Sequence, residues 1–270
     1  MAESHKLKGN EFFRNKEYAN AIEEYGKAIL KDPTNSIYYT NRAMAEIKLE
    51  KYDQVVADCQ RAIELGSTFK AYYYLGLAQT EIGILRKAEE NLKTGYEMAL
   101  KDKSPSAPAI CQAILNVRKK LWEDREKKRL AQVAPLLIEV EDMFAAKLEK
   151  ELQEAEKTLS GEELADEKDY LQSEHDKKLE TIRTIFSRAD EKYAPKEVPD
   201  YLTDPISFNL FVDPVISKSG NSFERSWILQ HLKTSSTDPF SRQPLTANDL
   251  IPNIQLKAAA EDFIQKEGTF

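Results

Sequence analysis

Four polar side chains near the N-terminus have the types and spacing of a carboxylate-binding site. Lys6 and Asn10 are four residues apart, so they share one face of a predicted helix. Asn41 follows in the motif YYTNRA, and Lys70 lies at the start of a later predicted helix. Two ammonium groups and two amides can donate to a carboxylate, and such charge-assisted hydrogen bonds contribute about 1.5–3 kcal/mol each. A free peptide C-terminus with an acidic side chain nearby would satisfy these donors.

The elements that must position these side chains form an internal repeat. Residues of similar size recur 33 or 34 positions apart, with small side chains in most columns. The columns are Gly9, Ala43 and Gly76; Ala21, Val55 and Ala88; Ala28, Ala62 and Gly95; and the larger Tyr18, Tyr52 and Leu85. Small residues let paired helices approach closely, and the larger residues fill the space between them. The period predicts three helix pairs that stack to form a concave groove.

Residues 2–101 therefore resemble three units of the tetratricopeptide repeat (TPR). The resemblance implies that first helices line the groove, where the four side chains converge. It likens them to the two-carboxylate clamp that holds acidic C-terminal tails of seventy- and ninety-kilodalton heat-shock chaperones. The resemblance adds Lys48 to the clamp and places Tyr73 in an apolar side pocket. Some clamp domains have an arginine where this chain has Tyr74, which leaves the second carboxylate contact and the chaperone preference open.

One alternative to the clamp is that these lysines are simply solvated on exposed helices. A single surface lysine is ordinarily in that state. The clamp hypothesis therefore depends on the whole set of side chains and not on any one of them.

A second candidate site lies in residues 195–270. The stretch DPISFNLFVDPV (204–215) places apolar residues between two Asp-Pro turns, with neither a helical face nor strict strand alternation. The segments VIS and SFE around a KSGN turn predict a short hairpin, and RSWILQHLK predicts an amphipathic helix. A second loop with two prolines follows at 234–246, and a last helix is predicted at 253–266 with Asn253 as its cap.

This segment resembles the U-box, a small α+β domain similar to a RING domain but without zinc. The matching stretches are PDYLTDPISFNLFVDPV, SGNSFERSWILQHL, DPFSRQPLT and LIPNIQLKAAAEDFI. The resemblance implies that hydrogen bonds and ion pairs replace the metal in shaping the two loops. The candidates for this network are Asp204, Ser217, Ser219, Glu224, Arg225, Asp238, Ser241, Arg242 and Asn248.

The U-box resemblance also implies a docking groove for a ubiquitin-conjugating enzyme. The groove residues would be Ile206, Phe208, Pro239 and Leu245. Arg242 resembles the arginine that bridges this enzyme and its bound ubiquitin, which holds the thioester ready for attack. Catalysis would then be positioning, without a covalent intermediate on this chain. Two alternatives stay open, since Arg242 could be a structural donor and Ile206 could be partly core.

Residues 102–194 between the two sites predict a charged helical hairpin. Its first helix has a narrow apolar seam, formed by Leu130, Val133, Leu137, Val140 and Phe144. Pro135 interrupts this helix, so we expect a kink or a restart there. Ser160 and Glu163 form a capping box for a second helix that continues to about Lys192. A two-helix hairpin has little core of its own, which favours dimerisation through a four-helix bundle, with a rigid spacer as the alternative.

Composition limits the remaining functions. The chain has 270 residues with a net charge of −7, which argues mildly against general nucleic-acid binding. No apolar run is long enough to span a membrane, and no secretory signal is visible. The two cysteines are far apart, which favours a reducing cytoplasm. Two cysteines and three scattered histidines cannot build a pair of zinc sites. We therefore expect no metal and no cofactor, and a zinc-dependent enzyme is disfavoured.

Together these features predict a mainly α protein with a three-repeat TPR solenoid, a helical hairpin and a U-box. The order of domains resembles the chaperone-associated ubiquitin ligases. The resemblance implies a dimeric co-chaperone that binds chaperone tails, recruits a ubiquitin-conjugating enzyme and ubiquitinates misfolded clients in the cytoplasm. The alternative is a non-catalytic TPR co-chaperone adaptor whose U-box is only a structural element.

Overall fold

The computed structural model describes residues 1–66, 68–133, 135–189 and 198–266, with no side chains described for 130–133 and 187–189. The chain divides into two compact units. The larger contains residues 1–121 together with the described residues from 198 onward, and the smaller contains the described residues from 122 to 189. Each unit is described by itself below.

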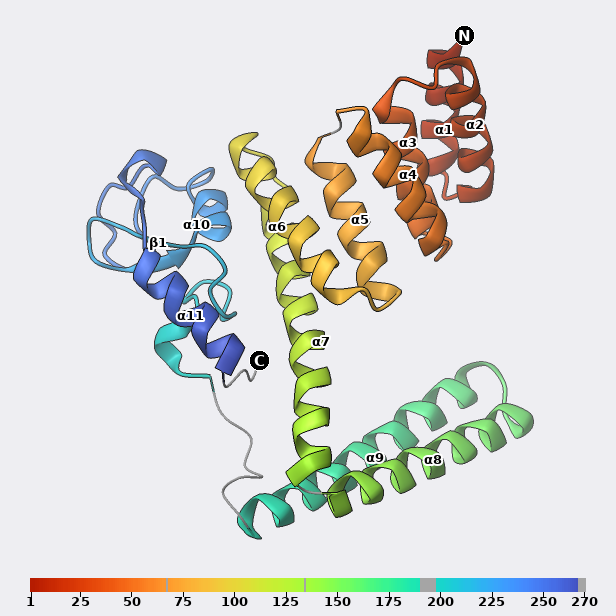
Figure 1. Ribbon diagram of the computed structural model, residues 1–270, viewed down its shortest axis with the longest axis vertical. Helices are drawn as coiled ribbons and strands as arrows, with labels where there is room; N and C mark the ends of the chain where they lie inside the picture. The colour runs from red at the N-terminus through yellow and green to blue at the C-terminus, as the bar shows by residue number, and fades with distance from the viewer. Residues whose placement is uncertain (67, 134, 190–197, 267–270) are drawn as a thin grey trace. The chain divides into compact units, whose positions relative to one another are not determined.

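Three antiparallel helix pairs open the larger unit, as the sequence period predicts (Figure 1). The helices are α1 (Ala2–Arg14), α2 (Tyr18–Lys31), α3 (Ser36–Ile47), α4 (Tyr52–Glu64), α5 (Phe69–Glu81) and α6 (Leu85–Lys101). The small-residue columns mark close helix contacts. A Cβ atom at Gly9 would lie 2.5 Å from the Tyr25 ring, and one at Gly76 would lie 2.5 Å from Leu92. Only glycine therefore fits these two positions without displacing a buried side chain.

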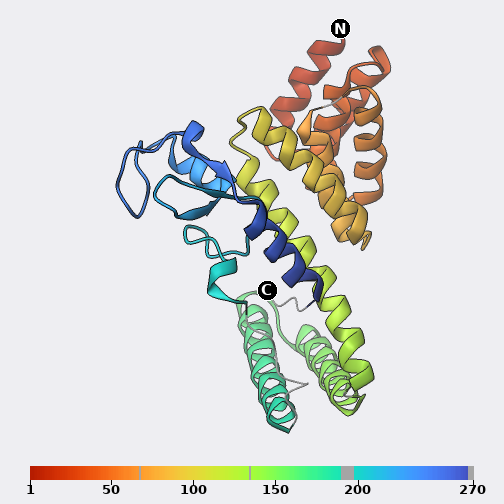
Figure 2. The same cartoon turned by 60° about the vertical axis from the view of Figure 1, so that its left-hand side comes forward.

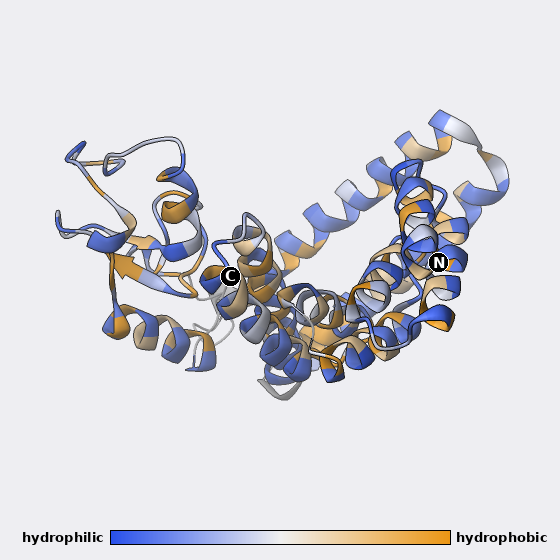
Figure 3. Cartoon of the chain, turned by 90° about the horizontal axis from the view of Figure 1, so that it is seen from above, coloured by the Kyte–Doolittle hydropathy of each residue, from blue (hydrophilic) through white to orange (hydrophobic). Residues whose placement is uncertain are grey.

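The helices of the repeats are amphipathic, and Figure 3 shows hydrophobic and hydrophilic residues interspersed along them. The strongest apolar faces belong to α2, α4 and α6, whose buried residues include Ala21, Val55 and Leu92. Within the described parts of the chain, no helix is both long and apolar enough to cross a membrane.

Helix α7 (Ala107–Val133) begins in the larger unit, and residues 107–117 contribute to the largest hydrophobic core. The same core contains Leu210, Phe211 and Val212 from the apolar stretch of the C-terminal region. Figures 1 and 2 both show α11 (Ile254–Lys266) running near α7, and Ala260 of α11 is buried in this core. The repeats and the C-terminal region therefore share one apolar interior.

The C-terminal region is a small α+β fold around a three-stranded antiparallel sheet of order β2-β1-β3. Its elements are β1 (Pro214–Ile216), β2 (Ser222–Glu224), α10 (Arg225–His231), β3 (Ile251–Pro252), α11 and 3₁₀ turns at Asp200–Leu202 and Ala247–Asp249. The predicted hairpin and both helices are confirmed. The Asn253 side chain accepts a hydrogen bond from the amide of Leu256 at 3.1 Å, as expected for a cap. Strand β3 was not predicted, because two residues are too short to show a period.

The smaller unit contains an antiparallel hairpin of α8 (Pro135–Thr158) and α9 (Gly161–Ala189). Its register is marked by ion pairs of 2.7 Å, one from Arg183 to Glu141 and one from Lys168 to Glu156. Helix α7 ends at Val133 and α8 begins at Pro135, which confirms the predicted interruption.

The predicted seam of this hairpin is only partly described. Leu137 is buried, and Val140 and Phe144 are half-buried. The side chains of Leu130 and Val133 lie outside the described residues, as does the predicted helix end at Lys192.

Candidate functional site

The predicted clamp residues lie on the first helices of the three pairs, except Lys48, which follows the end of α3 directly. Asn10 of α1 and Asn41 of α3 are in direct contact, because the Asn41 Nδ2 donates to the Asn10 Oδ1 at 3.3 Å. The hydroxyl of Tyr25 donates to the same oxygen at 2.8 Å. With its oxygen occupied, Asn10 keeps its Nδ2 without a hydrogen-bond partner among the described residues. The two amides are thus oriented to offer N–H donors to a ligand.

Tyr25 contacts the candidate site, and the clamp hypothesis did not include it. It is fully buried in α2, where Gly9 leaves space for its ring, and burial raises its pKa to about 12. Its neutral hydroxyl can therefore serve as a fixed donor to Asn10. The repeat pattern contained one clue, since Tyr25 lies four residues after Ala21, a small residue of the repeat columns.

The three clamp lysines have different surroundings. The Lys6 ammonium lies 2.5 Å from Glu3, on the preceding turn of α1. Lys48 and Lys70 are exposed, and neither has an ion pair among the described residues. The Lys6 side chain is half-buried and that of Glu3 is exposed, and a pair near the surface contributes only about 0–1 kcal/mol. Glu3 is therefore a weak competitor for a carboxylate ligand.

Tyr73 lies on α5 and is partly buried against the largest core. Its ring lies 5.6 Å from that of Tyr74, centroid to centroid. Burial raises the pKa of Tyr74 to about 12, so this residue is neutral where some clamp domains have an arginine. Any second carboxylate must therefore find its cation elsewhere.

A group of charged side chains links α3 to α4. Arg42 donates two hydrogen bonds of 2.6 Å to the Asp58 carboxylate. Glu46 lies 3.9 Å from the same guanidinium and is 4% exposed, and its Oε2 has no hydrogen-bond partner among the described residues. Burial, reinforced by the negative charge of Asp58, raises the pKa of Glu46 to about 7.

The first loop of the C-terminal region is held by Asp204, which is fully buried. Its Oδ2 accepts a hydrogen bond from the Ser207 amide at 2.7 Å, and its Oδ1 accepts one from the Glu224 amide at 2.8 Å. Its own amide and carbonyl pair with Asn209 and Phe208 across the loop, at 2.7 and 2.8 Å. A single aspartate thus holds the loop with four hydrogen bonds, two to its carboxylate and two through its own backbone groups.

The second loop is held in the same way by Asp238, which is 2% exposed. Its carboxylate accepts hydrogen bonds from the hydroxyls of Ser217 and Ser219 at 2.8 and 2.5 Å, and from the amides of Phe240 and Ser241 at 2.9 Å. Burial alone would raise the pKa of Asp238, but these donors lower it well below its usual range. The carboxylate therefore stays ionised at neutral pH.

Of the other predicted network residues, two contribute their side chains to the network and two have exposed side chains. Glu224 is buried, and Arg225 donates to Asp213 at 2.6 Å. Arg242 contributes its backbone amide, which donates to the Asp238 carbonyl at 3.0 Å, while its side chain is exposed. Asn248 is exposed on the 3₁₀ turn near the second loop.

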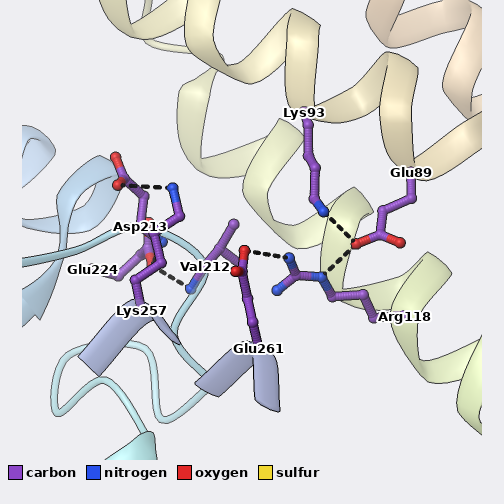
Figure 4. Close-up of polar contacts among 8 residues, drawn as sticks. All are labelled: Glu89, Lys93, Arg118, Val212, Asp213, Glu224, Lys257 and Glu261. Carbon is purple, nitrogen blue, oxygen red and sulfur yellow. Dashed lines mark hydrogen bonds and ion pairs between the residues drawn. The ribbon is translucent and has the colours of Figure 1, made fainter. Parts of the chain in front are cut away.

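Glu224 has a partner that the sequence did not suggest. Its Oε2 accepts hydrogen bonds from the amides of Val212 and Asp213, both at 2.8 Å (Figure 4). Its Oε1 accepts a hydrogen bond of 2.7 Å from the hydroxyl of Tyr96 in α6. Burial raises the pKa of Glu224, and the three donors oppose that shift. No local pattern could reveal a contact between residues 128 positions apart.

The predicted groove residues differ in exposure. Phe208 is 82% exposed, and Ile206 and Pro239 are half-buried, with Ile206 packed against the core of the small fold. Leu245 is only 3% exposed and belongs to that core. The expectation that Leu245 lines an open groove is therefore corrected, because its side chain supports the second loop from inside.

Among the residues that the structure describes, no group of three or more histidine, cysteine or acidic side chains is arranged to hold a metal ion. Cys59 and Cys111 are both buried, and burial raises their pKa values. Buried thiols with raised pKa values are poor nucleophiles.

Comparison with known proteins defines the class first. The U-box domain family matches residues 198–269, and the family described as the CHIP N-terminal tetratricopeptide repeat domain matches residues 117–195, which include the hairpin. The three helix pairs at residues 2–101 lie outside both matches, and the U-box is the domain of a class of ubiquitin ligases.

The particular family follows from a relative that matches almost the full length. The E3 ubiquitin-protein ligase CHIP of Arabidopsis thaliana is 30% identical over 272 residues, covering 98% of this chain and 94% of that protein. The chain belongs to the CHIP family and is a U-box ubiquitin ligase.

Two further matches cover smaller parts. The Hsp70-Hsp90 organising protein of Plasmodium falciparum is 40% identical over 73 residues, covering 27% of this chain and 13% of that protein. The solved TPR2B-domain:pHsp70 complex of yeast Sti1 is 29% identical, with a TM-score of 0.43, and covers 44% of this chain and 97% of that one.

Proposed function

We propose that this ubiquitin ligase captures acidic chaperone tails with its TPR clamp and ubiquitinates the chaperone-bound client through its U-box. The observation that carries the capture step is the contact between Asn10 and Asn41, which fixes two amides on adjacent first helices. Lys6, Lys48 and Lys70 supply positive charge on the same set of helices or at their ends. A terminal carboxylate is the ligand that best matches amide and ammonium donors together.

The preferred tail would come from the seventy- and ninety-kilodalton heat-shock chaperones. One relative is named an Hsp70-Hsp90 organising protein, which supports this class of partner. The acidic residues before the carboxylate would approach the exposed ammonium groups of Lys48 and Lys70, and Tyr73 would contact an apolar side chain of the tail.

The conjugating enzyme would dock on the two loops of the U-box. Phe208 presents an exposed aromatic ring, and Ile206 and Pro239 present half-buried apolar surface. Arg242 has an exposed guanidinium that can donate hydrogen bonds to both the enzyme and ubiquitin. Ubiquitin would pass directly from the enzyme to a client lysine, and this chain would contribute positioning.

The hairpin would form the dimer. Leu136, Met143, Tyr170 and Ile185 are each at least 60% exposed on α8 and α9, although they are large and apolar. Pairing two hairpins would bury such residues. A Met143→Glu and Ile185→Glu variant is expected to halve the molecular mass in solution, and a wild type that is already monomeric would favour the spacer alternative.

Calorimetric titration with an acidic C-terminal peptide tests the clamp. Lys6→Ala and Lys70→Ala are each expected to weaken binding about 10- to 100-fold, as the loss of a charge-assisted bond predicts. Lys31→Ala on the second helix α2 is the matched control and should bind as the wild type does. Binding that ignores amidation of the peptide C-terminus would exclude a carboxylate clamp.

A reconstituted ubiquitination assay separates this mechanism from the adaptor alternative. Ile206→Ala and Arg242→Ala are each expected to abolish most chain formation, whereas Asn248→Ala, an exposed change near the second loop, should have no effect. A U-box that serves only as a structural element would leave all three variants equal, and client transfer compared with and without the chaperone tail would test the coupling of the two sites.

A further inference from the structure

The first U-box loop is fastened at both ends to one buried residue, Glu224. At the start of the loop, the Asp204 carboxylate accepts a hydrogen bond from the Glu224 amide at 2.8 Å. At its end, the amides of Val212 and Asp213 donate to the Glu224 Oε2. Phe208 lies between these anchors, so its position depends on where Glu224 is held.

Glu224 in turn depends on a residue outside the U-box. A carboxyl oxygen that is buried away from water is costly unless it has a hydrogen-bond partner. Its Oε2 is satisfied within the U-box, but its Oε1 receives the hydroxyl of Tyr96 from the third repeat at 2.7 Å. Tyr96 is 4% exposed and Glu224 is 2% exposed, so water cannot readily replace this donor.

The surrounding contacts fix Tyr96 in place. Tyr96 belongs to the same apolar core as Phe211 and Val212 of the loop and Ile114 of α7. The Asn209 side chain of the loop also donates to Gln112 of α7 at 3.3 Å. The C-terminal end of the loop therefore packs against the helices of the larger unit, while Phe208 stays 82% exposed.

A cluster of ion pairs beside the apolar core links the helices against which the loop packs. Arg118 of α7 donates to Glu89 of α6 at 2.9 Å and lies 4.0 Å from Glu261 of α11 (Figure 4). Lys93 pairs with the same Glu89 at 2.9 Å. Burial would raise the pKa of Glu89, but these two cations lower it, so the carboxylate stays ionised.

We propose that Tyr96 is a positioning residue for ubiquitin transfer, which acts through Glu224 to fix the loop that presents Ile206 and Phe208 to the conjugating enzyme. This inference rests on the proposed docking role of that loop. It adds that the repeat domain completes the docking surface, so the U-box segment alone lacks one donor that its loop requires.

Tyr96→Phe tests the proposal, because it removes one oxygen atom and keeps the buried ring. Tyr72→Phe is the matched control, since Tyr72 is a half-buried tyrosine of the same repeat whose hydroxyl has no hydrogen bond among the described residues. In single-turnover discharge of the ubiquitin-loaded enzyme, Tyr96→Phe is expected to raise the KM for that enzyme about tenfold, with kcat nearly unchanged. Tyr72→Phe should match the wild type.

A second measurement does not depend on activity. Amide hydrogen exchange at Val212 and Asp213 should accelerate about tenfold in Tyr96→Phe, while exchange in α1 to α4 stays as in the wild type. Combining Tyr96→Phe with Glu224→Gln should give a smaller loss than the sum of the single losses, since both changes alter the same contact between the Tyr96 hydroxyl and the Glu224 Oε1 position.

The outcomes are distinguishable. Unchanged KM and unchanged exchange in Tyr96→Phe overturn the proposal, and so does a lowered melting temperature with no change in KM, which would make Tyr96 only structural. If the wild type fails to discharge the enzyme, the docking role fails instead. Faster amide exchange in the loop would then show only that Tyr96 holds the loop through Glu224. The positioning role of Tyr96 would be rejected together with the docking role.

Discussion

Phe208 and Arg242 occupy equivalent positions in the two U-box loops and share the same unusual backbone conformation, with φ of 57° and 58°. Each is the fifth residue of an Asp-Pro-x-Ser-x sequence, and each donates its amide to the carbonyl of the first residue, at 2.8 and 3.0 Å. A positive φ costs a non-glycine residue some backbone strain. Both loops therefore accept strain at the residue proposed to contact the conjugating enzyme or ubiquitin.

The equivalence extends to the anchoring aspartates. Asp204 and Asp238 each accept the amide of the serine three residues later, and each donates its own amide to the carbonyl five residues later. Isolated bridges then close each loop, from Thr203 to Leu210 and from Thr237 to Pro244. Two copies of one hydrogen-bonding pattern thus shape the proposed docking surface.

Substitution of Phe208 and of Leu245 should separate docking from stability. Phe208→Ala should leave the unfolding of the U-box unchanged, because its ring is 82% exposed, but weaken conjugating-enzyme binding at least about tenfold. Leu245→Ala should cost about 2–5 kcal/mol of stability, as expected for a buried leucine. Hydrogen exchange in β1 and β2, together with an enzyme-binding isotherm, checks both. Equal destabilisation by the two variants would contradict the burial difference.

Asp238→Asn should loosen the second loop. The substitution keeps the shape but removes the charge that accepts five hydrogen bonds, and leaving some donors unpaired costs about 1–3 kcal/mol. Asn248→Ala on the neighbouring turn is the control. The measurement is exchange at the amides of Phe240 and Ser241, which should accelerate in the Asp238 variant alone.

The pH dependence of this contribution follows from the lowered pKa of Asp238. A carboxyl group whose pKa is lower in the folded state stabilises at every pH above its unfolded value. That stability is lost as the pH falls below this value, so the loop should loosen only in strong acid. A wild-type loop that loosens near pH 6 would argue against the ionised anchor.

The helix pairs were predictable from the sequence because their signals are local or periodic. Gly9 and Gly76 recur with the repeat and mark close helix contacts, and Pro135 marks the start of α8. Asn253 caps α11, as predicted from an asparagine that directly precedes a helical apolar pattern.

The arrangement of the loops was not predictable for a physical reason. The apolar stretch 204–215 has no period. The sequence therefore cannot show that Phe208 is exposed and Phe211 is buried, because this depends on the helix surface against which the loop packs. That surface comes from α7, about a hundred residues earlier in the chain. The same holds for Tyr96 and Glu224, whose contact depends on how the repeat helices pack against the U-box.

Gly9→Ala should weaken the clamp without touching a proposed ligand contact. The added Cβ would lie 2.5 Å from the Tyr25 ring, which must then shift and lose its hydrogen bond to Asn10. We expect about 1–3 kcal/mol of destabilisation and several-fold weaker peptide binding. Gly26→Ala is the control, since its Cβ would meet only the end of Arg42 at 3.6 Å. Peptide titration and thermal unfolding of both variants provide the check.

Glu3→Gln should strengthen binding of an acidic tail. Glu3 competes for the Lys6 ammonium at 2.5 Å, and removing its charge frees that cation for the ligand. A pair near the surface contributes at most about 1 kcal/mol, so the affinity should rise no more than about fivefold. Glu11→Gln, an exposed change on the same helix, is the control. An affinity that rises no more than in Glu11→Gln would show that the freed Lys6 ammonium does not contact the ligand.

Glu46 should make the repeat domain less stable as the pH rises from 5 to 8. Burial raises its pKa from 4.5 to about 7, so between these values the folded chain holds a proton that the unfolded chain has released. Stability must then fall with rising pH up to about 7 and level off above it. The loss should be about 1–3 kcal/mol, since each unit of pKa shift corresponds to about 1.4 kcal/mol.

Glu46→Gln should remove this slope, whereas Glu90→Gln, an exposed change on α6, should retain it. Glu24 does not interfere, because hydrogen bonds from His5 and Lys27 lower its pKa to about 2 and its contribution changes only below about pH 4.5. Thermal unfolding of the three proteins at pH 5 and pH 8 measures the effect. A wild type and a Glu46→Gln variant with the same pH dependence would show that Glu46 is already ionised in the folded chain at pH 5, for instance through a closer approach to Arg42 than 3.9 Å.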